Sequence, residues 1–150
     1  MQKHLAIVSV VFILAFTVNA QEKLSESQKA IQQAVGNVFE ALSNRDSITL
    51  KNYCVEDILL FEYGQVWNLD SLIQKAIKRN TSSDFQRVNT IQFLYTTVDK
   101  NVGWASYNLH SEITSAGKKS TVHWLETVVL VRMKKKWKLK VLHSTLIKRT

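Results

Sequence analysis

Apolar residues recur at helical spacing in two stretches of the first half of the chain. The first stretch follows Ser25-Glu26-Ser27-Gln28, which resembles a capping box and predicts the start of a helix. Asp46 is a good N-cap for a second, short helix that ends near Tyr53. A third helix is expected to start around Asn68 or Leu69. The apolar stripe of the first helix is Ile31, Ala34, Val35, Val38, Phe39 and Leu42, and that of the third is Leu69, Leu72, Ile73, Ala76 and Ile77.

The second half of the chain has the pattern of strands. One strand is expected earlier, at 58–63, with a turn at Gly64, and from about Gln86 the pattern predicts four successive strands of about a dozen residues each. Their turns fall at 98–101, 115–118 and 133–136. Helices gathered early and strands late predict an α+β fold, in which three helices pack on a mainly antiparallel sheet. Strands of this length must twist and coil, so the sheet is expected to curve strongly and leave a concave cone.

The last two strands place an acid and a histidine within apolar runs. If Arg132 lies opposite Trp137, then Glu126 lies opposite His143 on the face that carries Val128, Leu130, Leu139 and Val141. A register shifted by one residue would instead set Glu126 opposite Ser144 and Arg132 opposite Lys138, which is a poorer match of side chains. We therefore expect Glu126 and His143 to form a polar pair on the inner face. The pair could be the floor of a pocket or a purely structural contact.

Two segments resemble a known family over most of the chain. The segments are "FEALSNRDSITLKNYCVEDILLFEYGQVWNLDSLI" and "WLETVVLVRMKKKWKLKVLHST", and together they resemble the NTF2-like (SnoaL-like, DUF4440-type) superfamily of cone-shaped α+β domains. The second segment is also similar to the closing hairpin of the association domain of calcium/calmodulin-dependent kinase II. It departs from that pattern at Lys134-Lys135, where relatives commonly carry Asp-Gly. The positions that match this hairpin are Glu126, Thr127, Arg132, Lys136, Trp137 and His143.

The resemblance implies a pocket between the curved sheet and the first and third helices. It also implies a choice of functions, because members of the superfamily include isomerases, cyclases, dehydratases and epoxide hydrolases, as well as non-catalytic modules that often dimerise through the outer sheet face. Fold alone does not select among these functions.

Three functions are consistent with these residues. The first is binding of a small apolar or amphipathic molecule above a floor of Glu126 and His143, with aromatic walls. The second is a cofactor-independent lyase or isomerase, in which His143 moves a proton and Glu126 orients it. The third is an assembly module that uses the outer sheet face, where Val129, Val131 and Leu142 are expected among lysines. The aromatic residues expected at the pocket are Trp124, Tyr63, Trp67 and Tyr53.

The N-terminus has the features of an export signal. Lys3 and His4 precede an almost wholly apolar stretch at 5–18, and Val18-Asn19-Ala20 offers small residues for cleavage. We therefore expect a signal peptide at 1–20 and a single mature domain at 21–150, secreted or periplasmic and without a stable membrane span after removal of the signal.

Composition excludes several other functions. The mature chain has one cysteine, Cys54, which is expected to be a small core residue, so no internal disulfide can form. The histidines lack a short ligand motif, so no metal site is expected. The net charge of +8 would attract anionic partners, but the lysines of 133–140 are better explained as protection of a sheet edge than as a nucleic-acid site.

Overall fold

The structure is a computed structural model that describes residues 23–150, so the predicted signal peptide at 1–20 lies outside the described residues. The helical elements are α1 (Glu26–Ser43), α2 (Ser47–Tyr53), α3 (Leu69–Leu72) and the π-helical segment η1 (Ile73–Lys78), which continues α3. The strands are β1 (Cys54–Glu62), β2 (Gln65–Trp67), β3 (Gln86–Asp99), β4 (Val102–Ser115), β5 (Lys118–Met133) and β6 (Lys136–Arg149). The α+β class and the order of elements predicted from the sequence are confirmed.

The predicted helix starts are confirmed by their hydrogen bonds. At α1 the Ser25 hydroxyl accepts from the backbone N–H of Gln28, and the Gln28 side chain accepts from the Ser25 N–H at 2.7 Å. At α2 the Asp46 carboxylate accepts from the N–H groups of Ile48 and Thr49. These caps satisfy donors that have no partner within the helix. Among residues 23–150, no helix has the length and apolar character needed to cross a bilayer.

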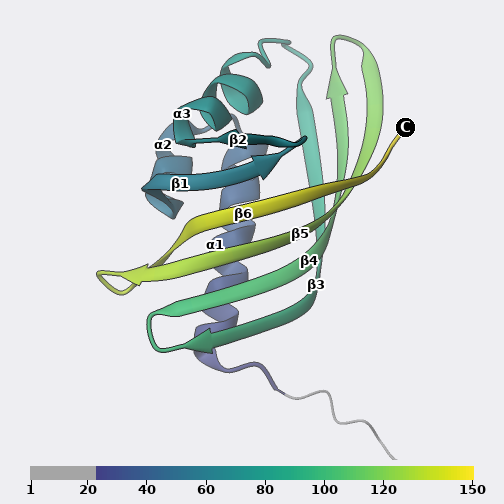
Figure 1. The fold of residues 1–150 in the computed structure, drawn as a ribbon. Coiled ribbons are helices and arrows are strands. Elements are labelled where there is room, and N and C mark those ends of the chain that lie inside the picture. The colour runs from purple at the N-terminus through teal and green to yellow at the C-terminus, as the bar shows by residue number, and fades with distance from the viewer. Residues whose placement is uncertain (1–22) are drawn as a thin grey trace, which may run out of the picture.

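The sheet has six strands in the order β2-β1-β6-β5-β4-β3. All neighbours are antiparallel except β1 and β6, which are parallel. The four long strands bend strongly, and α1 runs across one face of them (Figure 1). The inner residues of the strands and the stripe of α1 form one apolar core, in which Ile31, Val35, Tyr107, Val128 and Leu130 are almost wholly buried.

The β5–β6 turn forms without the glycine or asparagine that tight hairpins prefer. Lys134 and Lys135 both have positive φ, 47° and 68°. Two consecutive residues with positive φ are typical of a type I′ turn, whose twist matches that of the flanking strands. The predicted pairing beside the turn is confirmed, because Arg132 lies opposite Trp137 and Leu130 opposite Leu139.

Further from the turn, the predicted pairing of Glu126 with His143 is wrong. A β-bulge inserts Lys140 into β6, so that the next pair after Leu130 with Leu139 is Val129 with Val141. An extra residue in a strand with a side-chain period of two moves every later side chain to the other face. Glu126 therefore lies opposite Ser144 and His143 opposite Thr127. For the same reason Leu142, expected on the outer face, is buried on the inner one.

Candidate functional site

The concave face of the sheet encloses a cavity of about 280 Å³ against α1, α3 and η1. Most of its wall is apolar, since alternate residues of β1, β4, β5 and β6 face inward with the stripe of α1. This composition, with a few polar groups among apolar ones, is typical of small-molecule sites. Representative wall residues are Phe39, Leu42, Leu60, Leu109, Trp124 and Leu139.

Glu126 is the most deeply buried charged side chain at this cavity, with 3 % of its surface exposed. The Ser144 hydroxyl donates to its Oε1 at 2.5 Å, whereas its Oε2 has no hydrogen-bond partner. Burial raises the pKa of Glu126 to about 7, and the charge of Glu62 adds to this rise, while the hydroxyls of Ser144 and Tyr107 oppose it. A carboxyl group with such a pKa exchanges a proton near neutral pH.

Tyr107 lies on β4 directly opposite Glu126 and is fully buried. Its ring packs edge-on against Phe39 and Phe93, at centroid distances of 6.0 and 5.4 Å. Burial, together with the negative charge of Glu126, raises the pKa of Tyr107 well above its usual value, so the hydroxyl keeps its proton. The hydroxyl is close enough to lower the pKa of Glu126, although it makes no hydrogen bond to any described residue.

A second carboxylate, Glu62, faces the same cavity from β1. The parallel pairing of Phe61 with His143 sets Glu62 beside Ser144, so Tyr107, Glu126, Ser144 and Glu62 form a row across four neighbouring strands. Burial raises the pKa of Glu62, an effect that Ser144 and the positive charge of Arg87 oppose. Two carboxyl groups that line the cavity therefore flank the buried hydroxyl of Ser144.

Arg87 of β3 supplies a cation to the cavity wall. Its Nε donates to Asn89 Oδ1 at 2.9 Å and its Nη2 to Ser111 Oγ at 3.2 Å. The guanidinium carbon lies 5.8 and 5.7 Å from the ring centres of Phe39 and Trp124, within cation–π range. Among the described residues, no ion pair within 4.0 Å joins Arg87 to Glu62 or Glu126. The guanidinium is thus fixed in the wall by neutral partners.

Aromatic and basic residues surround the mouth of the cavity. Tyr63 and Trp67 have ring centres 6.2 Å apart, and Tyr63 is 51 % exposed. Lys75 of η1 lies 4.0 Å above the Trp67 ring, and Arg149 of β6 donates to the Tyr63 hydroxyl at 3.0 Å. These contacts join β2, η1 and the end of β6 around the opening.

The structure brings together four of the six site residues predicted from the sequence. Glu126, Trp124, Tyr63 and Trp67 all line the cavity, whereas Tyr53 packs against the core and is not among the lining residues. His143 is exposed on the outer face, with its ring 6.1 Å from that of Phe61. The predicted Glu126–His143 floor is therefore replaced by Glu126, Ser144 and Glu62.

Sequence reasoning missed Glu62, Arg87, Tyr107 and Ser144. Along β1, Ile58 and Leu60 alternate with outward residues, and Glu62 is the next inward position. This alternation was a usable signal for Glu62. The same holds for Tyr107, which follows Ala105 on β4.

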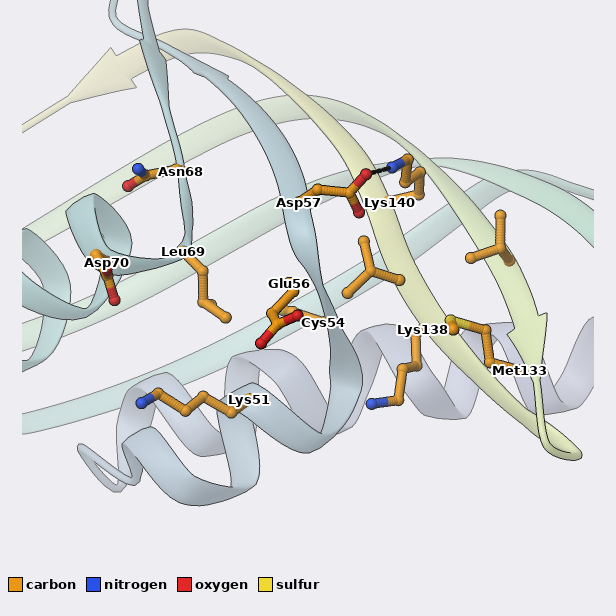
Figure 2. A pocket seen from close by; sticks show the side chains of 12 residues that line it. Lys51, Cys54, Glu56, Asp57, Asn68, Leu69, Asp70, Met133, Lys138 and Lys140 are labelled. Atoms are coloured by element: carbon orange, nitrogen blue, oxygen red, sulfur yellow. Dashed lines mark hydrogen bonds and ion pairs between the residues drawn. The ribbon is translucent and has the colours of Figure 1, made fainter.

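A second, larger hollow of about 880 Å³ lies between β1, the ends of β5 and β6, α2 and α3. Figure 2 shows charged side chains of both signs reaching into it, among them Lys51, Glu56 and Lys138, with an ion pair between Lys140 and Asp57. It opens where the pairing of β1 with β6 shifts between Cys54 and Leu59. Cys54 lies in the walls of both hollows and is 2 % exposed, which confirms a core position, and burial raises the pKa of its thiol to about 12. Such a thiol is unreactive.

Comparisons with known proteins agree with this architecture. A conserved protein from Planctomyces limnophilus superposes with a TM-score of 0.72 at 15% identity, covering 81% of this chain and 98% of that one. An NTF2-like protein from Cytophaga hutchinsonii superposes with a TM-score of 0.69 at 12% identity, and the match covers 83% of this chain and 100% of that one. A ketosteroid isomerase-like protein from Erwinia carotovora atroseptica superposes with a TM-score of 0.66 at 14% identity, and the match covers 83% of this chain and 99% of that one. At these identities the likeness shows the fold alone.

A comparison with curated proteins found no match. The family model for the SnoaL-like domain, in contrast, matches residues 31–147, which include most of α1 and all the strands except the last two residues of β6. The chain therefore belongs to the family of SnoaL-like domains, and its fold is that of the NTF2-like protein from Cytophaga hutchinsonii.

Proposed function

We propose that this domain binds a small, largely apolar molecule in the inner cavity, with Glu126 as its polar anchor. The observation that carries this proposal is the unpartnered Oε2 of Glu126 at the wall of an apolar cavity. A buried carboxyl oxygen without a partner costs free energy, and a ligand group that bonds to it would recover that cost. The cavity volume of about 280 Å³ suits a small ligand.

Closing the cavity tests this proposal. Ala76 of η1 lines the cavity, so Ala76→Phe would fill part of the space, whereas Ala30 on the exposed side of α1 serves as a matched control. Native mass spectrometry of protein from its own source should show a bound small molecule in the wild type and in Ala30→Phe. We expect the bound fraction in Ala76→Phe to fall at least about tenfold. Equal occupancy in all three proteins, or no bound molecule in any, would contradict the proposal.

Proton transfer is a second candidate function for the same site. A carboxyl group with a pKa of about 7 is suited to act as a general acid or base at neutral pH. Glu126 then carries the role that the sequence predicted for a Glu126–His143 pair, because His143 lies on the other face of the sheet. Loss of turnover in Glu126→Gln, with ligand binding retained, would favour an isomerase or lyase over a binding domain.

We also propose that the outer sheet face forms a homodimer. This face carries a belt of exposed or half-exposed apolar side chains that spans β1, β6, β5, β4 and β3, and belts of this kind favour association. Its members include Leu59, Phe61, Val141, Val129, Trp104 and Tyr95.

Light scattering tests the dimer. We expect a dimer for the wild type, and at least a tenfold weaker dimer for Trp104→Glu, since the charge would lie within the apolar belt. Thr121→Glu, at the exposed end of β5, should leave the dimer unchanged. A monomeric wild type at high protein concentration would rule the dimer out.

Export remains part of the proposal. It is supported by the basic start, the apolar stretch at 5–18 and the small residues of Val18-Asn19-Ala20.

A further inference from the structure

We propose that the cavity recognises an amine, held as its ammonium form between the carboxylates of Glu126 and Glu62. This inference rests on the proposed binding function and names the chemical class of the ligand.

The charges on the cavity floor are unbalanced. On the floor, Glu126 and Glu62 face the guanidinium of Arg87, and no ion pair within 4.0 Å joins Arg87 to either carboxylate in residues 23–150. The other two cations that line the cavity, Lys75 and Arg149, lie at its mouth. Two of the Arg87 donors are already used by Asn89 and Ser111. When both carboxylates are ionised, the floor carries one net negative charge. A buried charge of this kind is stabilised by a cation in direct contact.

The basic residues at the mouth do not supply that cation. Lys75 donates to Gln65 Oε1 at 3.1 Å and lies over the Trp67 ring, while Arg149 donates to the Tyr63 hydroxyl. Both contacts are exposed to solvent, so water and salt screen these charges from the floor.

The hydrogen-bonding groups of the floor are also matched to a donor ligand. Ser144 already donates to Glu126 Oε1, and the Tyr107 hydroxyl, which is not among the groups that line the cavity, makes no hydrogen bond in the described part of the chain. The carboxyl groups of Glu126 and Glu62 both line the cavity and hold the remaining acceptor capacity of the floor. An ammonium group has up to three N–H donors and no acceptor, so it satisfies both carboxylates at once.

The walls favour an apolar body on this amine. Trp124 and Trp67 line the cavity together with the leucines of β1, β4 and β6, and aromatic faces attract cations that lie above them. An arylalkyl amine combines the two features.

The amine class predicts the sign of the pH dependence. Two ionisable groups line the cavity from β1, Glu62 and Cys54, and Arg87 lines it from β3; Tyr107 of β4 also acts on the pKa of Glu126. At the mouth lie Tyr63, Lys75 of η1 and Arg149 of β6, while the residues of α1 that line the cavity are apolar. Of the groups on the floor, Glu126 titrates near neutral pH. An ammonium ligand needs this carboxyl ionised, so its affinity rises with pH. A carbonyl ligand would accept a hydrogen bond from the protonated carboxyl, and its affinity would fall as pH rises.

Three probes of similar size separate these classes: 2-phenylethylamine, 2-phenylethanol and 4-phenyl-2-butanone. Binding is followed by NMR chemical-shift changes of the full mature protein between pH 5.5 and 7.5, where the amine stays protonated. We expect the amine to bind most tightly at pH 7.5 and its affinity to drop at least about tenfold by pH 5.5. Glu126→Gln should weaken amine binding at pH 7.5 at least about tenfold, and should weaken it more than it weakens binding of the alcohol.

Glu112→Gln provides the matched control, because Glu112 is an exposed acid on the outer face of β4. This variant should bind the amine as the wild type does. If the ketone or alcohol binds more tightly than the amine at pH 7.5, or if amine affinity falls with rising pH, the amine inference is wrong while the binding function stands. If none of the three probes binds the cavity, and Ala76→Phe retains as much bound molecule as the wild type in mass spectrometry, then the amine inference and the proposed binding function are both wrong. The pH dependence of amine binding is measured on the wild type, so the proposal can be tested even if Glu126→Gln does not fold.

Discussion

Replacing Gly103 with valine is expected to lower the free energy of unfolding by about 3 kcal/mol, the upper part of the usual range for overpacking a core. Gly103 lies on β4 between Val98 and Leu130, with its inner side against α1. A Cβ at this position would come within 2.2 Å of Ile31 Cδ1 and 3.0 Å of the Thr97 carbonyl oxygen. Ile31 could move, but the Thr97 oxygen belongs to the backbone of the neighbouring strand. The added side chain would therefore push α1 away from the sheet. Urea unfolding followed by circular dichroism measures the effect.

Gly36→Val is the matched control for this prediction. Gly36 lies in α1, and a Cβ there meets nothing within 4 Å. Valine has a slightly better helix propensity than glycine, so the free energy of unfolding should be unchanged or higher by a few tenths of a kcal/mol. Equal losses in both variants would mean that the approach of α1 to β4 is not as close as described.

The wild-type protein is expected to lose about 3 kcal/mol of stability between pH 4.5 and 7.5 because of Glu126 alone. The pKa of this carboxyl is about 7 in the folded protein, against an ordinary value of 4.5. Since the folded state holds the proton more tightly, it binds more protons than the unfolded state between these values. The stabilisation from Glu126 is therefore fully present below about pH 4.5 and is lost as pH rises through 7.

Urea unfolding of the wild type and Glu126→Gln at a series of pH values isolates this contribution. Other acids titrate in both proteins, so the difference between the two curves reports Glu126. We expect this difference to shift by about 3 kcal/mol in favour of Glu126→Gln from pH 4.5 to 7.5. Glu112→Gln, which changes an exposed acid, should follow the wild type throughout. Parallel curves for the wild type and Glu126→Gln would mean that burial does not perturb this carboxyl.

Most of the fold could be predicted because local patterns specify it. The stripe from Ile31 to Leu42, the Ser25 and Asp46 caps and the three turns between long strands all occur where the sequence placed them. The short strand β2 and the π-helical end of α3 were not predicted. Three residues are too few for a periodic signal, and a π-helix differs from an α-helix only in hydrogen-bond spacing.

The candidate site was less predictable because it depends on one inserted residue. Counting alternate residues back from the β5–β6 turn predicted that Glu126 lies on the inner face of the sheet, and it does lie there. The bulge at Lys140 has no glycine or other local signal, so side-chain parity failed from Val141 to Leu146, where a second bulge at Ile147 restores it. Arg87 shares the inward face of β3 with Asn89 and Ile91, so strand alternation was a usable signal for Arg87 as well.

The most direct test of the account is the pKa of Glu126 in the folded protein. It can be measured from the side-chain carboxyl ¹³C shift of selectively labelled protein, assigned by comparison with Glu126→Gln. We expect a midpoint of about 7, in keeping with a buried carboxyl at the wall of an apolar cavity. A midpoint near the ordinary value of 4.5 would contradict it, since Glu126 would then be solvated and could not be the anchor of a ligand site.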